Sequence, residues 1–257
     1  MRRVVYFLLL LISASSCLSK KELVYIQNDN LKENVPTTVP STYKPYQLQM
    51  NDVLSVKVQS HEPEISNIYN IIPPSSAFGF GDPGTMFLSG YSIDEEGFVN
   101  LPNVGKLKVA GLTVAQTQEL IQSNVSRYIN DATVVVKLIS FRVSVLGEVN
   151  RPGQFFIYNE RATVLEALSM AGDLSRGASR ENVKLVRQTP SGSDVVLIDL
   201  KDPNLVQSKY YYMQPNDVLY VEPTKELIKR DNLIGLNVAS LALGVVSTAV
   251  VILNYFK

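Results

Sequence analysis

A run of 24 residues without a charged side chain, residues 233–256, constrains this chain more than any other feature. As an α-helix rising 1.5 Å per residue, the run would be about 36 Å long, enough to cross a hydrocarbon core of about 30 Å. Charged residues stand on both sides of it, and an aromatic pair precedes the final Lys257, as at a membrane interface. We therefore predict a transmembrane helix at residues 233–256, joined to the preceding body by a linker at residues 223–232.

The polar residues of this span fall on one side of the predicted helix. At 100° per residue, all its Asn, Ser and Thr residues lie within an arc of about 120°. They are Asn237, Ser240, Ser247, Thr248 and Asn254. A polar stripe facing lipid is costly, so the stripe is expected to face water or other helices. We hypothesise that it lines a pore; the alternative is a helix-packing seam of small residues.

The beginning of the chain predicts a lipoprotein signal peptide. Two arginines precede an apolar stretch at residues 4–12, and small residues follow directly before Cys17, the chain's single cysteine. Such a segment is too short to span a bilayer and is typical of a cleaved leader. We expect residues 1–16 to be removed and Cys17 to carry lipid; ordinary cleavage that leaves a free thiol is the alternative. The polar stretch at residues 17–42 is predicted to be a tether.

Composition excludes most chemistries. One Cys and one His exclude an internal disulfide, a cysteine-rich zinc site and a histidine-based triad. Because 24 Lys and Arg balance 24 Asp and Glu, the formal net charge is zero, and the chain has no overall positive electrostatic potential that would attract nucleic acid. The glycine pattern at residues 79–84 follows a Pro-Pro pair instead of a strand, so we reject a dinucleotide site. No enzyme activity, cofactor or metal is predicted.

Between the ends, the pattern predicts an α+β body of many short strands and two capped helices. Alternating or β-branched runs indicate strands, and capping boxes open helices at Thr113 and Thr163. The strands are expected near residues 53–58, within 91–110, and at 133–136, 142–146, 183–186, 195–200 and 218–221. Residues 60–90 are expected to form a long loop, and a turn is expected at residues 150–153, with Gly153 at positive φ.

One segment occurs twice. Residues 49–56 and residues 214–221 share six of eight positions, including the Asn-Asp pairs that end at Asp52 and Asp217. The shared pattern predicts an Asx-type turn that feeds a buried strand, with the Asp accepting backbone amides. We interpret the two segments as one building block used twice.

Several of these segments resemble the Wza-type polysaccharide export family. The opening of its export domain is similar to Tyr46-x-Leu48-x-Met50-Asn51-Asp52-Val53-Leu54, although Gly usually occupies the place of Asn51. A small β-grasp fold, the SLBB domain, is similar to Val145-Leu146-Gly147-Glu148-Val149-x-x-Pro152-Gly153 and to the helix that ends at Gly172. Asp173 departs from that pattern, because a second Gly commonly stands there.

The resemblance implies an export domain at residues 43–139 and a β-grasp-like SLBB domain at residues 140–222, before the transmembrane α-helix. Asp52, Gly147, Pro152, Gly153 and Asp217 would be structural motif residues. It further implies a homo-oligomeric ring in the outer membrane, anchored by lipid, with its body in the periplasm. Such a ring would export capsular or extracellular polysaccharide and would meet an inner-membrane polysaccharide copolymerase.

Two other classes stay open. A glycan hydrolase or transferase is disfavoured because residues 94–96 are adjacent acids on a predicted turn, and His61 is expected in an exposed loop. A carbohydrate-binding or scaffolding lipoprotein with a simple helical anchor is the main alternative. Its best feature is the run Tyr210–Tyr212, which could stack on sugars, although a strand with packed faces is the favoured interpretation.

Overall fold

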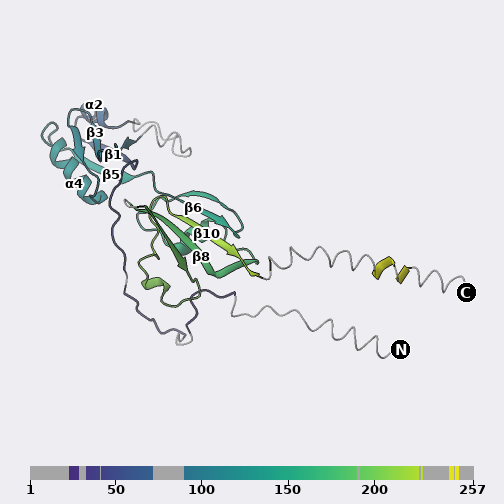
Figure 1. Cartoon of the computed structure of the whole chain (residues 1–257). Coiled ribbons are helices and arrows are strands. Elements are labelled where there is room, and N and C mark those ends of the chain that lie inside the picture. The colour runs from purple at the N-terminus through teal and green to yellow at the C-terminus, as the bar shows by residue number, and fades with distance from the viewer. Residues whose placement is uncertain are drawn as a thin grey trace, which may run out of the picture.

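Two hydrophobic cores, formed by consecutive parts of the chain, organise the body (Figure 1). The first is built from residues between Leu48 and Val136, and the second from residues between Phe141 and Val221. Leu138, in the last strand before the junction, packs against both cores. The computed structural model describes residues 23–28, 33–40, 42–71, 90–189, 192–225, 227, 243–245, 247 and 248.

The first unit combines a small antiparallel sheet with a hairpin and one long helix. Its elements are β1 (Val53–Gln59), α2 (Pro63–Ser66), η2 (Asn67–Tyr69), β2 (Tyr91–Ser92), β3 (Phe98–Leu101), β4 (Gly105–Lys108), α4 (Val114–Val125) and β5 (Thr133–Leu138). The sheet order is β2-β1-β5, and β3 and β4 pair separately. The α4 helix buries Thr117, Ile121 and Val125, so its apolar face closes the first core.

The second unit is a five-stranded mixed sheet. Its elements are β6 (Arg142–Gly147), β7 (Gly153–Phe156), α5 (Val164–Met170), β8 (Ala178–Thr189), β9 (Gly192–Ile198), η3 (Leu205–Gln207) and β10 (Val218–Pro223). The order is β7-β6-β10-β8-β9, with β10 parallel to β6 and the other pairs antiparallel. Buried residues of α5 join the sheet's core. The body is therefore α+β, with mostly sheet and few helices, as predicted.

Local signals in the sequence located most of these elements correctly. Thr113 and Thr163 both form capping boxes, in which each side chain accepts the amide three residues later. The α4 helix that Thr113 opens ends at Val125. The predicted loop at residues 60–90 contains α2 and η2, which we did not expect. Its glycine-patterned part, residues 79–84, lies outside the described residues.

The predicted membrane segments fall mostly outside the part of the chain that the structure describes. The signal peptide, Cys17, Asn237, Ser240 and Asn254 are among these undescribed residues. Within the described residues, no helix has the length and apolar character needed to span a bilayer. Ser247 and Thr248 lie in a short described helical stretch and donate hydrogen bonds to the Gly244 carbonyl at 2.9 and 2.8 Å.

Gly147 has a geometric reason to be glycine. It ends β6 with φ +89°, and a Cβ atom placed on it would lie 2.1 Å from the Val221 carbonyl oxygen of the parallel strand β10. An L side chain would therefore meet both backbone strain and a backbone clash. Gly153 does not have the positive φ that we predicted: it begins strand β7 opposite Val145, and an added Cβ would meet only Phe155, at 3.8 Å.

This difference gives a prediction with a matched control. Gly111 has nearly the same φ, +87°, but nothing lies within 4 Å of an added Cβ. Gly111→Ala is expected to cost about 1–2 kcal/mol, the strain of the left-handed conformation. Gly147→Ala is expected to lower the free energy of unfolding by at least twice as much as Gly111→Ala does, because β6 must also move away from β10. Urea unfolding of the full chain in detergent, followed by far-UV circular dichroism, measures both; equal losses would contradict the clash.

Candidate functional site

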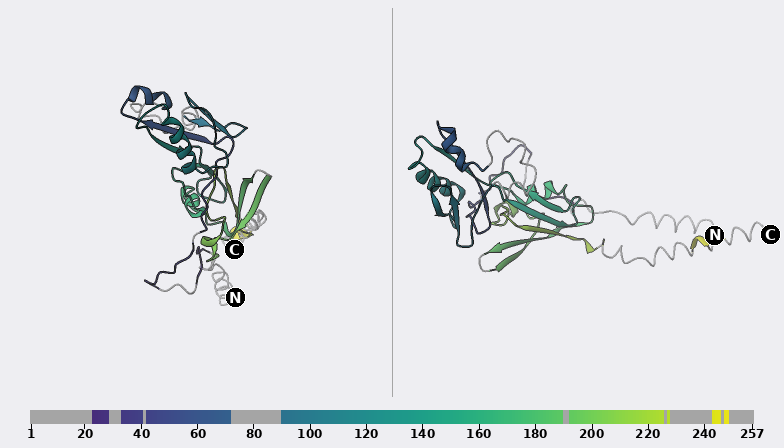
Figure 2. Two further views of the ribbon diagram at one scale, coloured as in Figure 1. Left: turned by 90° about the vertical axis from the view of Figure 1, so that its left-hand side faces the viewer. Right: turned by 90° about the horizontal axis from the view of Figure 1, so that it is seen from above.

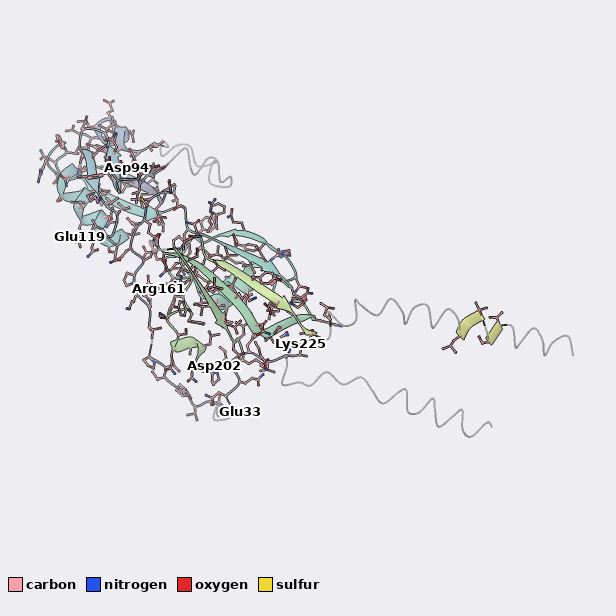
Figure 3. The ribbon with its side chains drawn as sticks, in the orientation of Figure 1. Glu33, Asp94, Glu119, Arg161, Asp202 and Lys225 are labelled. Carbon is pink, nitrogen blue, oxygen red and sulfur yellow. The ribbon has the colours of Figure 1, made fainter. Side chains whose placement is uncertain are left out.

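The two units meet at a cleft of about 700 Å³. The first unit contributes residues 42–46, the amino end of α4 at residues 113–115, and Lys137 and Leu138. The second contributes the loop at residues 157–161, the ends of β8 and β9, and the loop at residues 209–215 that precedes β10. Arg161, labelled in Figure 3, lies where the two bodies meet. The cleft is thus assembled from segments far apart in the sequence.

Tyrosines form one wall of the cleft. Tyr43 packs edge to face on Tyr212, with ring centroids 5.1 Å apart, and Tyr212 packs on Tyr211 at 5.4 Å. These tyrosines of the second unit lie in the loop between η3 and β10, so the predicted strand at Tyr210–Tyr212 is wrong. All three are half-buried; Tyr210 and Tyr211 pack against the second core, and Tyr210 and Tyr212 line the cleft. Tyr158 lies in the same cleft with 80% of its surface exposed.

Cationic groups lie over these rings. The Arg161 guanidinium is 4.4 Å from the centroid of Tyr43, and Lys209 Nζ is 4.7 Å from that of Tyr210. Contacts at these distances are attractive because the ring face is negative. The cleft wall therefore alternates aromatic and positive groups.

The two Asn-Asp turns lie at the same junction and share one geometry. Asn51 and Asn216 have φ +68° and +65°, and each following Asp accepts the amide three residues before it. The distances are 2.9 Å from Gln49 N to Asp52 Oδ2 and 2.6 Å from Gln214 N to Asp217 Oδ2. The structure thus confirms the predicted turn that feeds a buried strand. Asn tolerates this left-handed position better than most residues with a side chain.

Beyond these shared amide contacts, the two carboxylates have different partners. Asp52 accepts from the Tyr46 hydroxyl at 2.9 Å and from the Ser140 hydroxyl at 3.4 Å. The Asp217 carboxylate accepts hydrogen bonds from both Nε and Nη2 of Arg187, at 3.0 and 2.7 Å, and the two groups form a buried bidentate ion pair. Arg187 Nη2 also donates to the Tyr212 carbonyl at 2.8 Å. The pair therefore connects β8, the turn before β10 and the tyrosine wall.

Burial dominates the electrostatics of both carboxylates. It raises the pKa of Asp52, against the hydrogen bonds from Gln49, Tyr46 and Ser140. Burial likewise raises the pKa of Asp217, and Arg187 opposes that effect. The pKa of Tyr46 is raised by burial and then by the carboxylates of Asp52 and Asp217. Tyr46, which donates to Asp52, and Gln214, which donates to Asp217, both line the cleft, so the two turns lie at the same junction.

The arrangement suits non-covalent binding. Both buried carboxylates hold the fold through hydrogen bonds, and among the described residues no cluster of His, Cys, Asp or Glu could hold a metal ion. Asp94 lies on the predicted turn, where the Phe98 and Glu96 amides donate to its carboxylate and the Phe98 bond lowers its pKa. His61 is exposed in a bend before α2, as expected.

The structure brings only some predicted residues to the site. Asp52 and Asp217 lie at the junction, whereas Gly147, Pro152 and Gly153 do not line the cleft. Sequence reasoning missed Tyr43, Arg161 and Lys209. Their only sequence signal is that Tyr and a cation stand within a few residues of each other in three separate places, at residues 43–46, 158–161 and 209–212.

Comparison with known proteins assigns a domain to each unit. Residues 40–139 match the family described as polysaccharide biosynthesis/export protein, and residues 141–221 match the SLBB domain. Two relatives are named "EPS I polysaccharide export outer membrane protein EpsA". The protein from Ralstonia nicotianae is 34% identical over 137 residues, which cover 51% of this chain and 35% of the relative. The protein from Ralstonia solanacearum is 29% identical over 193 residues, which cover 71% of this chain and 49% of the relative. The chain thus spans between a third and a half of these relatives' length.

The two equivalent turns predict unequal responses to the same substitution. Asp217→Asn is expected to lower the free energy of unfolding by about 3–5 kcal/mol, because it leaves the Arg187 guanidinium buried without its carboxylate. Asp52→Asn is expected to cost about 1 kcal/mol or less, because an amide oxygen still accepts from Gln49 and Tyr46.

The folded-state pKa of Asp52 lies above the ordinary value, so at neutral pH its charged carboxylate opposes folding, and losing that charge offsets part of the lost hydrogen bonding. The same offset applies to Asp217, but there the buried Arg187 guanidinium left without a carboxylate outweighs it. Urea unfolding of both variants of the full chain measures the difference. A loss for Asp52→Asn as large as that for Asp217→Asn would contradict the role assigned to the ion pair.

Proposed function

Because this chain belongs to the Wza-type polysaccharide biosynthesis/export family, with an export domain followed by an SLBB domain, we propose that it is a subunit of an oligomeric outer-membrane channel for capsular or extracellular polysaccharide. The polymer would pass through a periplasmic vestibule and then through a barrel of helices. An inner-membrane polysaccharide copolymerase would be the periplasmic partner. The names of the family and of both relatives are those of export proteins, so the function is transport and not catalysis.

The observation that carries this proposal is the path of the chain at one end of the second unit. The Ile26 and Gln27 amides donate to the carbonyls of Leu200 and Lys201 at 2.9 and 2.7 Å. The chain leaves the same end, where the Thr224 amide donates to the Gly177 carbonyl at 2.7 Å. The first residues of β8 connect the two places, since the Leu200 amide donates to the Arg180 carbonyl.

That path gives the body an orientation. Cys17 stands eight residues before Tyr25, a distance of at most about 29 Å of extended chain, and residue 233 stands nine residues after Thr224. A lipid on Cys17 and a helix at residues 233–256 would therefore enter one membrane from the SLBB end. Figure 3 labels Lys225 at this end and Asp94 and Glu119 at the opposite end of the body, in the export domain. The export domain would then point into the periplasm.

In this proposal, the polar stripe of the terminal helix faces the pore. Asn237, Ser240, Ser247, Thr248 and Asn254 would supply a wet lining on every copy of the ring, whereas a lone anchor needs no such stripe. The boundaries proposed from the sequence, 43–139 for the export domain and 140–222 for the SLBB domain, leave a short linker at residues 223–232 between body and membrane.

Native mass spectrometry of the full chain, extracted from membranes in detergent, tests the assembly. We expect one defined homo-oligomer of many subunits. Cells that lack the chain should retain polymer inside the envelope, and restoring the chain should return it to the surface. A monomer, together with normal export in its absence, would contradict the channel and leave the anchored binding protein.

The lipid anchor has a separate test. Intact-mass measurement of the extracted chain should show residues 1–16 missing and a lipid adduct on Cys17. Cys17→Ala should lack the adduct because the thiol is the acceptor, while the neighbouring Ser19→Ala should keep it. The same lipid mass on Cys17→Ala would contradict the assignment.

A further inference from the structure

We propose that the cleft between the export and SLBB domains binds carboxylate-bearing saccharide units, of the uronic acid class. This inference rests on the proposed function, because it names the chemistry of polymer that the channel would favour. It is carried by the side chains that line the cleft and by their partners.

The charge of the cleft differs from that of the whole chain. Five cationic side chains line it, Lys44, Lys137, Arg161, Arg187 and Lys209, against the carboxylates of Glu160 and Asp194. Arg187 is paired with Asp217, and the other four have no ion pair among the described residues. Four cations against two carboxylates leave a local excess of two positive charges, on a chain whose formal net charge is zero. The amino end of α4 adds a partial positive charge to the same cleft.

The aromatic groups narrow the ligand class. Tyr43, Tyr210 and Tyr212 are half-buried and held by edge contacts or cations, so their positions are fixed before a ligand arrives. Tyr158, with 80% of its surface exposed, offers a ring that no described contact covers. An aromatic face packs on the C–H face of a sugar ring, and Arg and Lys bind carboxylate oxygens. A saccharide that carries carboxylates satisfies both kinds of group, whereas a neutral sugar leaves the cations unused.

The size and chemistry of the cleft agree with reversible binding. A volume of about 700 Å³ lies within the range of about 300–1,000 Å³ found for small-molecule sites. Lys44, Lys137, Arg161 and Lys209 are exposed, so their attraction for carboxylates is screened by salt. Binding at this cleft is therefore expected to weaken as ionic strength rises.

Calorimetric titration of the full chain in detergent tests the inference. The acidic probe is a tetrasaccharide of alternating glucuronate and N-acetylglucosamine, and the neutral probe is the N-acetylglucosamine tetramer of equal length. We expect the acidic probe to bind at least tenfold more tightly than the neutral one. The double variant Arg161→Gln with Lys209→Gln should weaken binding of the acidic probe at least tenfold, and Tyr158→Ala should weaken binding of both probes.

A matched control removes the same charge elsewhere. Lys106 and Lys108 lie on β4 in the export domain and do not line the cleft. Lys106→Gln with Lys108→Gln should leave binding of the acidic probe within twofold of the unchanged chain. An equal loss in this control would show that only net charge matters and would overturn the inference. Since Tyr158 is an exposed side chain, its loss of binding cannot be ascribed to unfolding.

Three further outcomes would also overturn the inference: no binding of either saccharide, equal binding of the two, or tighter binding of a tetraglutamate peptide than of the acidic saccharide. Export measurements separate this failure from that of the proposed function. Normal export by the chain without saccharide binding removes the cleft assignment alone. Unchanged export in cells that lack the chain, together with tight binding of the acidic probe, removes the channel and leaves the binding site.

Discussion

The buried ion pair between Arg187 and Asp217 is the contact on which the junction of the two domains depends. Arg187 lies near the end of β8, and Asp217 closes the turn that starts β10. Arg187 Nη2 also donates a hydrogen bond to the Tyr212 carbonyl. The Tyr212 ring in turn packs on Tyr43, which belongs to the segment that leads into the first domain. A buried guanidinium needs a counter-charge, so the pairing of Arg187 holds three parts of the chain in place. They are the turn at Asp217, the loop that contains Tyr212, and the segment that contains Tyr43. Figure 2 shows the two adjoining bodies from two further directions.

The sequence predicted those parts of the fold that depend on neighbours in the chain. Capping boxes at Thr113 and Thr163 satisfy amides three residues away, and the Asn-Asp turns satisfy amides equally close, so short motifs suffice to locate them. The tyrosines at residues 210–212 were assigned to a strand because alternating packed faces are the usual setting for such a run. Tyr212 instead packs on Tyr43, which comes from the other side of the junction, and no local pattern encodes that contact. The cleft was missed for the same reason.

Asp173 shows how a departure from a family pattern acquires a physical meaning. It follows Gly172 after the end of α5 and has φ +69°, a conformation that Gly adopts without strain, in agreement with the Gly that the resemblance implies there. Asp tolerates this conformation because its carboxylate accepts the Leu174 amide at 2.7 Å. The same carboxylate receives the Tyr25 hydroxyl, and Arg180 lies over the Tyr25 ring. The substitution thus fastens the segment that leads from the predicted lipid anchor to the SLBB domain.

This fastening bears on how a lipid anchor could contribute to an export channel. A long free tether would let the body move far from the membrane. With the contacts of Tyr25, Ile26 and Gln27, however, a lipid on Cys17 would be separated from the SLBB domain only by residues 17–25. Lipid and terminal helix would then constrain the same end of the body. Within such a ring, each copy would contribute one cleft with exposed cations. Transport requires sites that are favourable enough to be entered and weak enough to be left, and several salt-screened clefts side by side meet both conditions better than one tight site.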